Sequence, residues 1–363
     1  MTVYSYRDLA LQPCQRADQL TQSFQALAAR PVIRWSWLPA PATVALSYFA
    51  QGVDPALMDM DGFAFVPKEE HSAMDDIDVL IVTAHGADMS ERLMAFRQRN
   101  PKMLVLLWYW DNHLAEVNNL KCALYADLVF YSHAYAGNFL HNPVSAMGVH
   151  LPACSAQWTG QEARQLLDEL STQPRSDQLL LNYVDYKFSW RSELLARLRQ
   201  ELQQADALLM PADDRGRYFG KGPRERLQEW VSHKCTLILP VHRDLSTRVF
   251  DALLAGLVVI APRFINDFDA VFPPDVQQQL GMVRVDDLEM PTIRAAIEQA
   301  LRNFDEAGEA GAQARSRHIL DGHLMQHRLK TMLTVCRKAG EPGLAVRLTC
   351  GEGHAMGLRF VTA

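Results

Sequence analysis

One short segment of the chain combines residue types that could hold the phosphates and the ribose of a nucleotide: Ser246, Thr247, Arg248 and Asp251. Ser246 is a suitable N-cap, and the free N–H groups at the start of the helix after it would bind a phosphate. The guanidinium group of Arg248 fits phosphate oxygens, and Asp251, on the same helix face, could accept hydrogen bonds from two adjacent ribose hydroxyls. The alternative interpretation is an ordinary capped helix with an exposed Arg–Asp pair.

A second cationic segment, Tyr183–Arg191 (YVDYKFSWR), follows a predicted strand. Lys187 would lie just past the end of this strand, and Ser189 could cap the helix that carries Arg191. A strand, a cationic loop and a helix start together form a suitable cradle for a diphosphate. If this segment binds no ligand, Lys187 and Arg191 are instead solvated surface side chains.

Three residues in the first half of the chain could act as a general base toward an acceptor hydroxyl: His85, Asp111 and His113. Asp111 and His113 follow an apolar run that ends in WYW, and His85 follows IVTA, so all three would leave the ends of strands. An imidazole pKa near neutrality suits proton transfer at physiological pH, and the neighbouring aromatic rings suit stacking on a sugar. As alternatives, Asp111 caps a helix and the histidines lie in turns.

Motifs for a metal or a dinucleotide cofactor are missing from the sequence. His323 and His327 have the spacing of a zinc-binding helix, but Leu324 replaces the glutamate that metalloprotease chemistry requires. The segment GEGHAMG at 351–357 follows no predicted strand and opens no helix, so it lacks the context of a dinucleotide-binding loop. The six cysteines are widely spaced and form no CxxC pair, so we expect reduced thiols and no zinc knuckle.

Short apolar runs alternate with amphipathic stretches along the chain, which is the pattern of an α/β fold. The run MLVLLWYW is apolar on both faces, so it predicts a strand of a parallel sheet that is covered by helices on each side. The expected strands span 32–38, 78–83, 103–110, 128–131, 147–151, 179–184, 208–210, 236–240 and 258–261. The expected helices span 89–99, 114–123, 190–204, 224–232, 247–254, 290–304 and 320–338.

The alternation stops at 171–178 (STQPRSDQ) and then restarts, which predicts a domain boundary there. We therefore expect two Rossmann-like, doubly wound domains, residues 1–172 and 173–338, that face a cleft. Ligands of such domains bind outside the carboxyl ends of the strands. Residues 339–363 are Gly-rich and weakly patterned, and they form a tail for which we predict no element.

Composition argues against several classes of protein. A net charge of −6 without a basic tail or stripe disfavours nucleic acid as the main partner. The basic run Arg215–Arg226 (RGRYFGKGPRER) is interpreted as a solvated loop and helix start, with a small diphosphate pocket as the alternative. No apolar stretch reaches the roughly 18 residues that span a bilayer, and the N-terminus has no signal-peptide pattern. We therefore expect a cytoplasmic protein without a transmembrane segment.

The segment STRVFDALLAGLVVIAP at 246–262 resembles S-x-R-x-F-E-A-L-A-x-G-x-x-V-I, a motif of group 1 glycosyltransferases and especially of their spore-maturation-like subfamily. The similarity extends back through Tyr218–Pro240 and forward to ILDGHLMQHRLKTML, in which His323 and Arg328 match a His and an Arg of the family's closing helix. The resemblance implies the GT-B architecture, with a nucleotide-sugar donor in the second domain and an acceptor in the first. It also implies that Asp251 binds the ribose of the donor.

On this resemblance we expect a hexosyltransferase that moves a sugar from a nucleotide diphosphate sugar to an unknown acceptor, which could be a protein, a glycan or a small molecule. No metal or other cofactor is expected if Lys187, Arg248 and the helix N-termini neutralise the leaving diphosphate. Two positions depart from the family, because Asp251 replaces the usual Glu and Arg243 replaces a second Glu of many retaining members. Retention or inversion therefore stays open. The alternatives are an isomerase of nucleotide sugars and a non-catalytic nucleotide- or sugar-binding protein, both of the same fold.

Overall fold

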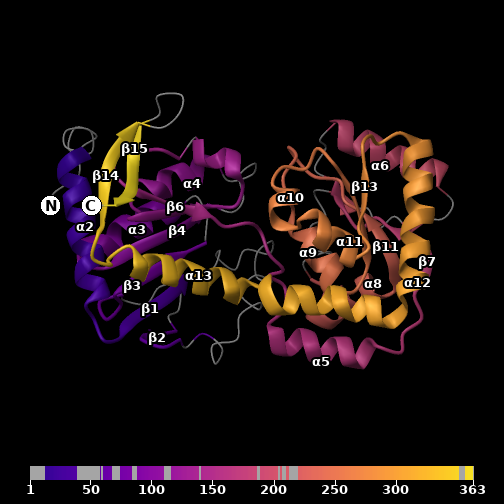
Figure 1. Ribbon diagram of the computed structural model, residues 1–363, viewed down its shortest axis with the longest axis horizontal. Helices are drawn as coiled ribbons and strands as arrows, with labels where there is room; N and C mark the ends of the chain where they lie inside the picture. Colours follow the sequence, from indigo (N-terminus) through magenta and orange to yellow (C-terminus); the bar gives the residue numbers. More distant parts are fainter. Residues whose placement is uncertain are drawn as a thin grey trace. The chain divides into compact units, whose positions relative to one another are not determined.

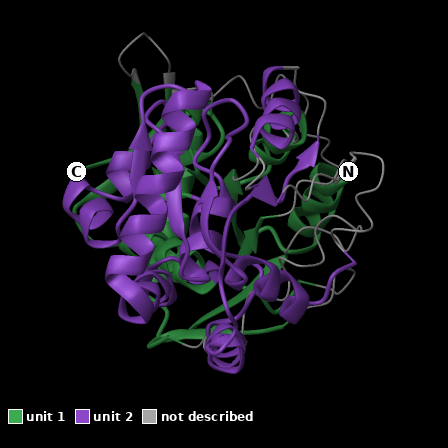
Figure 2. Ribbon diagram, turned by 90° about the vertical axis from the view of Figure 1, so that its right-hand side faces the viewer, with its two compact units in different colours: residues 1–41, 55–152, 326–363 green, residues 42–54, 153–325 purple. Residues whose placement is uncertain are grey.

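The computed structural model describes residues 13–38, 58, 60–67, 74–83, 88–109, 116–138, 140–185, 189–202, 205–206, 210–211, 220–350 and 356–362. The chain divides into two compact units, which Figure 2 shows in green and purple. Unit 1 comprises residues 1–41, 55–152 and 326–363, and unit 2 comprises residues 42–54 and 153–325. In the described part of the chain, the backbone enters unit 2 after residue 152 and returns to unit 1 after residue 325.

Unit 1 is built on an eight-stranded sheet. Its strands are β1 (Ile33–Leu38), β2 (Phe63–Phe65), β3 (Val79–Val82), β4 (Leu104–Tyr109), β5 (Leu128–Tyr131), β6 (Ala146–His150), β14 (Leu344–Cys350) and β15 (Met356–Thr362). Their order is β14-β15-β6-β5-β4-β3-β1-β2, and all neighbours pair in parallel except the antiparallel hairpin β14-β15. Its helices are α2 (Pro13–Ala28), α3 (Met89–Arg99), α4 (Glu116–Ala123), η3 (Ala134–Asn138) and α13 (Met325–Lys338).

Unit 2 contains a five-stranded parallel sheet and a short parallel pair. The strands are β7 (Ser176–Leu180), β8 (Val184–Asp185), β9 (Ala205–Asp206), β10 (Met210–Pro211), β11 (His233–Leu237), β12 (Val258–Pro262) and β13 (Val283–Val285). The large sheet has the order β13-β12-β11-β7-β9, and β8 pairs with β10. The helices are α5 (Gly160–Leu170), α6 (Ser189–Glu201), α8 (Pro223–Val231), α9 (Thr247–Leu254), α10 (Phe268–Val271), α11 (Pro274–Gln279) and α12 (Met290–Gly322).

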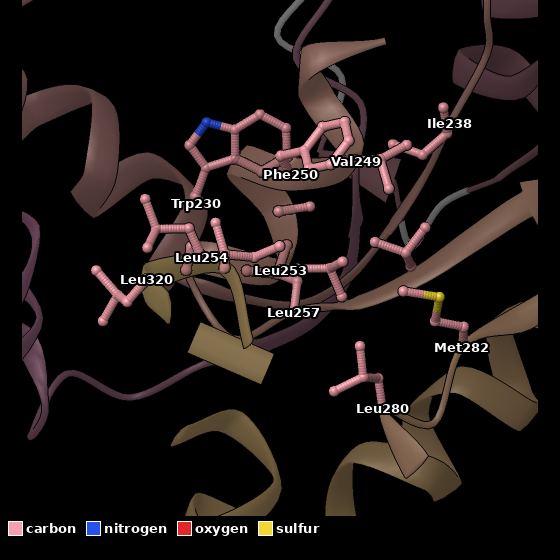
Figure 3. Packing of buried hydrophobic residues seen from close by; sticks show 14 of the residues in the cluster. Trp230, Ile238, Val249, Phe250, Leu253, Leu254, Leu257, Leu280, Met282 and Leu320 are labelled. Carbon is pink, nitrogen blue, oxygen red and sulfur yellow. The ribbon is translucent and has the colours of Figure 1, made fainter. Parts of the chain in front are cut away.

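Both faces of the large sheet of unit 2 are covered, which explains its continuous apolar strands. Val258 belongs to a core completed by α6 and the first half of α12, whereas the next residue, Val259, belongs to a core completed by α5, α8 and α9. Figure 3 shows part of this second core, in which Phe250 of α9 lies beside Trp230 of α8. The helix α12 contributes to both cores, and its axis is interrupted at Gly308, whose φ of 58° and ψ of −155° are not helical.

In each sheet, the chain adds strands first on one side and then on the other side of the strand that comes first in the sequence. In unit 2 the chain runs from β7 to β9 on one side and later places β11 on the other side of β7, so a topological switch point lies between β7 and β11. Unit 1 has the same reversal between β1 and β3. Ligands of open α/β sheets bind outside the carboxyl ends of the strands at such points. The topology therefore selects one edge of each sheet as a candidate site.

The expected fold class, α/β with two Rossmann-like parallel sheets, is confirmed, and two such units are the components of the GT-B architecture. The expected boundary between residues 172 and 173 is corrected to 152 and 153, because α5 packs its apolar face into the core of unit 2. The tail at 339–363 is not separate either. It forms the hairpin β14-β15, seen in yellow in Figure 1, which extends the sheet of unit 1 from β6 and packs against α2.

Several expected elements end at different residues. The strand expected at 179–184 is divided into β7 and β8, and the helix expected at 290–304 continues to residue 322 as α12. The helix expected at 320–338 begins at Met325, because α12 ends at Gly322 and the next residue, His323, has non-helical backbone angles. Within the described residues, no helix is sufficiently long and apolar to cross a membrane.

Candidate functional site

The switch point of unit 2 brings together two segments that lie far apart in the sequence. After β7, the chain continues through Asn182 and Tyr183 into β8. After β11, a loop leads to α9, which begins at Thr247. Because β7 and β11 are parallel neighbours, both segments leave the same edge of the sheet. This edge is where the topology predicts a ligand.

The buried ring of Tyr183 forms the centre of the site. Its hydroxyl donates a hydrogen bond to the carbonyl oxygen of Leu237 at 2.6 Å and accepts one from the N–H of Leu239 at 2.9 Å. The guanidinium carbons of Arg248 and Arg191 lie 4.4 and 4.6 Å from the centroid of this ring. Cation–π contacts contribute about 0.5–2 kcal/mol each. One fixed ring therefore holds two positive charges at the switch point.

A chain of polar contacts orients Arg248 further. Its Nη1 donates a hydrogen bond to Asn182 Oδ1 at 2.8 Å, and Asn182 Nδ2 donates to Glu229 Oε1 at 2.8 Å. The other carboxylate oxygen of Glu229 pairs with Lys221. Asn182 is buried, whereas Arg248 is half-buried. The guanidinium group of Arg248 is thus held in one direction and keeps exposed surface.

The start of α9 has the N-cap that the sequence predicts. Ser246 has extended backbone angles, and its hydroxyl accepts a hydrogen bond from the N–H of Arg248 at 3.3 Å. In the loop before it, His242 and Arg243 both have positive φ, 51° and 66°. This conformation is uncommon for residues that carry a Cβ, and such strain is concentrated at ligand-binding sites. The loop and the first turn of α9 are therefore suited to contact a ligand.

Asp251 lies one turn into α9, where only 1% of its surface is exposed. Its Oδ1 accepts a hydrogen bond from Ser155 Oγ at 2.7 Å, and its Oδ2 accepts one from Gln157 Nε2 at 2.5 Å. Burial raises the pKa of Asp251 to about 6, against the effect of these hydrogen bonds and of the charges of Arg248 and Arg226. Each oxygen of the carboxylate that was expected to receive ribose hydroxyls thus has a hydrogen-bond donor from unit 2 itself.

Lys221 and Arg226 of the basic run at 215–226 are part of this site, which corrects the interpretation of these two side chains as solvated, whereas Arg224 is exposed and residues 215–219 lie outside the described residues. Arg226 is 5% exposed, and its Nη1 donates a hydrogen bond to the carbonyl oxygen of Lys221. Lys221 in turn pairs with Glu229. The charge of Arg226 also acts on Asp251. These basic side chains are built into the switch point by the start of α8.

Five of the predicted site residues are described, and all lie in unit 2: Arg191, Ser246, Thr247, Arg248 and Asp251. Arg191 is buried, with its Nη2 donating to the carbonyl oxygen of Val184 at 3.3 Å, so its interpretation as a solvated side chain does not hold. The four others lie outside the described residues: His85, Asp111, His113 and Lys187.

The sequence did not point to several residues of the site: Ser155, Gln157, Asn182 and Glu229. Asn182 had a usable signal, because it is a polar residue directly after the apolar run LLL at the end of a strand. Ser155 and Gln157 had none, since their contacts with Asp251 join residues 96 and 94 positions apart.

The two histidines with zinc-like spacing, His323 and His327, do not lie on one helix, because α12 ends at Gly322 and α13 begins at Met325. The ring of His323 packs against Phe250, Phe272 and His318, with ring centroids 5.1–5.6 Å apart. Across the described part of the chain, no group of three or more His, Cys, Asp or Glu side chains could hold a metal ion.

Comparisons with known proteins give similar folds and one family match. A search of curated proteins gives no match. Similar solved structures include a mutant O-GlcNAc transferase from Thermobaculum terrenum, which is 12% identical with a TM-score of 0.48, covering 94% of this chain and 76% of that chain. They also include the sucrose-phosphate synthase from Thermosynechococcus elongatus, at 13% identity and a TM-score of 0.40, covering 89% of this chain and 90% of that chain. A third is the UDP-N-acetylglucosamine 2-epimerase from Rickettsia bellii, at 11% identity and a TM-score of 0.38, covering 86% of this chain and 99% of that chain.

The family match covers part of unit 2 and part of the site, and it extends into α13. Residues 193–334 match the model of a family described as glycosyl transferase-like. The matched segment includes α8, β11 and α9, and with them Arg226, Ser246, Arg248 and Asp251. In sequence, residues 193–334 are therefore glycosyl transferase-like.

Proposed function

We propose that the protein is a glycosyltransferase whose unit 2 binds a nucleotide diphosphate sugar as the donor. The observation that carries this proposal is the pair of guanidinium groups, from Arg191 and Arg248, held against Tyr183 at a topological switch point. When a sugar is transferred, the leaving diphosphate develops negative charge, and fixed positive groups and N–H donors are what stabilise it. The glycosyl transferase-like match over residues 193–334 supports the same reaction.

The diphosphate would lie at the start of α9. The first turn of α9 after Ser246 and the guanidinium group of Arg248 would contact its oxygens, with Thr247 at the first helical position. Lys187 would add a further charge from the segment before α6. With these groups in place the reaction requires no metal, so we expect full activity in the presence of EDTA. The motif at 246–262 supports a hexosyl donor and the spore-maturation-like subfamily.

Unit 1 would hold the acceptor. The candidates for the general base can be ranked by how close their strands lie to the switch point of this unit. β3 borders the switch point of unit 1, and His85 follows this strand by three residues. Asp111 and His113 follow β4, one strand further from the switch point. Substitution of the base should reduce transfer and leave nucleotide affinity unchanged. We expect the largest loss of transfer for His85→Ala.

An isomerase of nucleotide sugars is less favoured, because the family that matches unit 2 is described as transferase-like. Product analysis with the donor alone separates the two reactions, because an isomerase converts the donor without an acceptor. A non-catalytic protein would bind the donor and leave it unchanged in every mixture.

Calorimetric titration with uridine, guanosine, thymidine and cytidine diphosphates tests the donor site. For the diphosphate that binds best, we expect Arg248→Ala to weaken binding at least tenfold, because a charged hydrogen bond contributes about 1.5–3 kcal/mol. The matched control is Arg302→Ala, which removes an exposed guanidinium group from α12 of the same unit. Equal affinity of the wild type and Arg248→Ala for every diphosphate would refute the assignment.

A further inference from the structure

Two connections of the chain between the units are joined to each other inside unit 2. The backbone N–H of Ser155 donates to the carbonyl oxygen of His323 at 2.9 Å, and the N–H of Met325 donates to the carbonyl oxygen of Ser155 at 3.1 Å. Ser155 and Leu324 thereby form a parallel bridge. Ser155 follows the point after residue 152 where the chain enters unit 2, and Leu324 precedes the point after residue 325 where the chain leaves it. We refer to residues 153–158 and 323–325 as the connection pair.

Asp251 links the helix α9 to this connection pair. One carboxylate oxygen accepts from the Ser155 hydroxyl and the other from the Gln157 side-chain amide, at 2.7 and 2.5 Å. All three side chains are buried, with exposed fractions of 1% for Asp251, 0% for Ser155 and 4% for Gln157. Two charge-assisted hydrogen bonds in a buried place are strong and directional. They fix the helix against the connection pair.

A ribose would have to compete with both of these donors. The carboxylate has unused lone pairs, but almost none of its surface is accessible to an incoming hydroxyl. Displacing Ser155 or Gln157 would leave a buried polar group without its acceptor, which is unfavourable. The ligands of this carboxylate are therefore the two side chains that already contact it.

We propose that Asp251 is a positioning residue that anchors α9 to the connection pair, and that it does not bind the ribose of the donor. Arg248 lies three residues earlier on the same face of α9, so a fixed helix keeps its guanidinium group against Tyr183 and Asn182. The effect of Asp251 on donor binding rests on the proposed function, whereas its anchoring of α9 does not. Donor affinity and the mobility of the connection pair are therefore measured separately.

Asp251→Asn distinguishes the two roles. The asparagine keeps the shape of the side chain, with Oδ1 accepting from Gln157 and Nδ2 donating to the hydroxyl of Ser155, which can also accept. For an anchor, we expect the affinity for the best nucleoside diphosphate to stay within about threefold of the wild type. A ribose ligand would instead lose about tenfold or more, because charged hydrogen bonds contribute more than neutral ones.

Asp251→Ala removes the anchor. We expect it to weaken binding of the same diphosphate and of its 2′,3′-dideoxy analogue by the same factor, about tenfold. The conservative Asp251→Asn should restore binding of both ligands, which a general loss of stability does not explain. A loss in Asp251→Asn that is confined to the ribose form would overturn the proposal.

Hydrogen exchange measures the anchor without any ligand. Backbone amides of the connection pair should exchange faster in Asp251→Ala than in the wild type or in Asp251→Asn. Ser155→Ala and Gln157→Leu each remove one of the two hydrogen-bond donors to Asp251. These two variants are used in the same experiment if Asp251→Ala does not fold. Unchanged exchange in these variants would overturn the proposal. If the wild type binds no diphosphate, the proposed function fails and the exchange data alone decide on the anchor.

Discussion

Asp251→Asn should make the free energy of unfolding less sensitive to pH, because the buried carboxyl group that titrates in the wild type is absent from the variant. Burial raises the pKa of Asp251 from 3.8 to about 6, so the folded protein disfavours the charged carboxylate. The contribution of protonated Asp251 to the free energy of unfolding is fully present below about pH 4 and is lost as the pH rises through about 6. The shift of about two pKa units corresponds to about 3 kcal/mol, of which about 1.5 kcal/mol is lost between pH 5 and 7.5. Asparagine does not titrate, so the variant avoids this loss.

Urea unfolding of the wild type and the variant at pH 5 and 7.5 measures this effect. The buried side chains of Trp158 and Trp230 allow tryptophan fluorescence to follow unit 2. We expect the unfolding free energy of the variant minus that of the wild type to increase by about 1.5 kcal/mol from pH 5 to 7.5. Asp275→Asn, which removes an exposed carboxylate from α11, is the control and should show no such increase. A difference that stays constant or falls with pH would refute the reasoning.

Asp127→Ala should destabilise unit 1 by about 3 kcal/mol in urea unfolding at pH 7, because it leaves two arginine side chains without their buried carboxylate. Burial alone would raise the pKa of Asp127, but the two arginines lower it, so its contribution to stability is lost only as the pH falls through this lowered pKa; a variant as stable as the wild type at pH 7 contradicts this. Gly256→Ala should lower the unfolding free energy by about 1–3 kcal/mol, because φ is +81° and a Cβ would lie 3.0 Å from the Cβ of Ala312; an unchanged thermal midpoint argues against it. In a short alkylation followed by mass spectrometry, exposed Cys14 should react before Cys235, because burial raises the pKa of Cys235 to about 12, and the reverse order would contradict this.

The helix α9 could be predicted from the sequence because its signals are local. Ser246 caps it, the apolar residues of TRVFDALL cover its buried face, and Gly256 with φ of +81° follows its end. The structure has this helix at the predicted residues 247–254. The same holds for α3 at 89–99, and the parallel strands β4 and β12 followed from their continuous apolar runs.

The unit boundary and the C-terminal hairpin could not be predicted, because both depend on contacts between distant segments. The break at 171–178 contains the turn after α5 and the start of β7, and the apolar face of α5 packs into the core of unit 2. The strands β14 and β15 add to the sheet of unit 1 through β6, about 200 residues earlier in the sequence. Neither partner is visible in a local pattern of hydrophobicity.

The candidate site was predicted in part for the same reason. Arg248 and the N-cap Ser246 belong to a local motif, and the structure places Arg248 at the switch point. Its partner Asn182 lies 66 positions away, and Asn182 in turn contacts Glu229, 47 positions further along the chain, so only the folded topology brings these residues together. A ribose-binding role for Asp251 was predicted from its spacing to Arg248 and from the resemblance to group 1 glycosyltransferases, whereas the contacts that Asp251 makes depend on burial and on its two donors.

We expect the length of the side chain at position 251 to decide what its carboxylate contacts. Aspartate keeps its carboxyl group close to the backbone of α9, within reach of Ser155 and Gln157. Glutamate, the usual residue of the resembling family, would carry the carboxyl group about 1.5 Å further, which is one C–C bond. Because Asp251 is buried, we expect the longer side chain to fit only by displacing both donors. We therefore expect Asp251→Glu, despite its conserved charge, to increase amide exchange in the connection pair and to weaken diphosphate binding about as much as Asp251→Ala. If Asp251→Glu instead binds ribose diphosphates more tightly than the wild type and leaves dideoxy analogues unaffected, the carboxylate faces the ribose and the anchor is refuted.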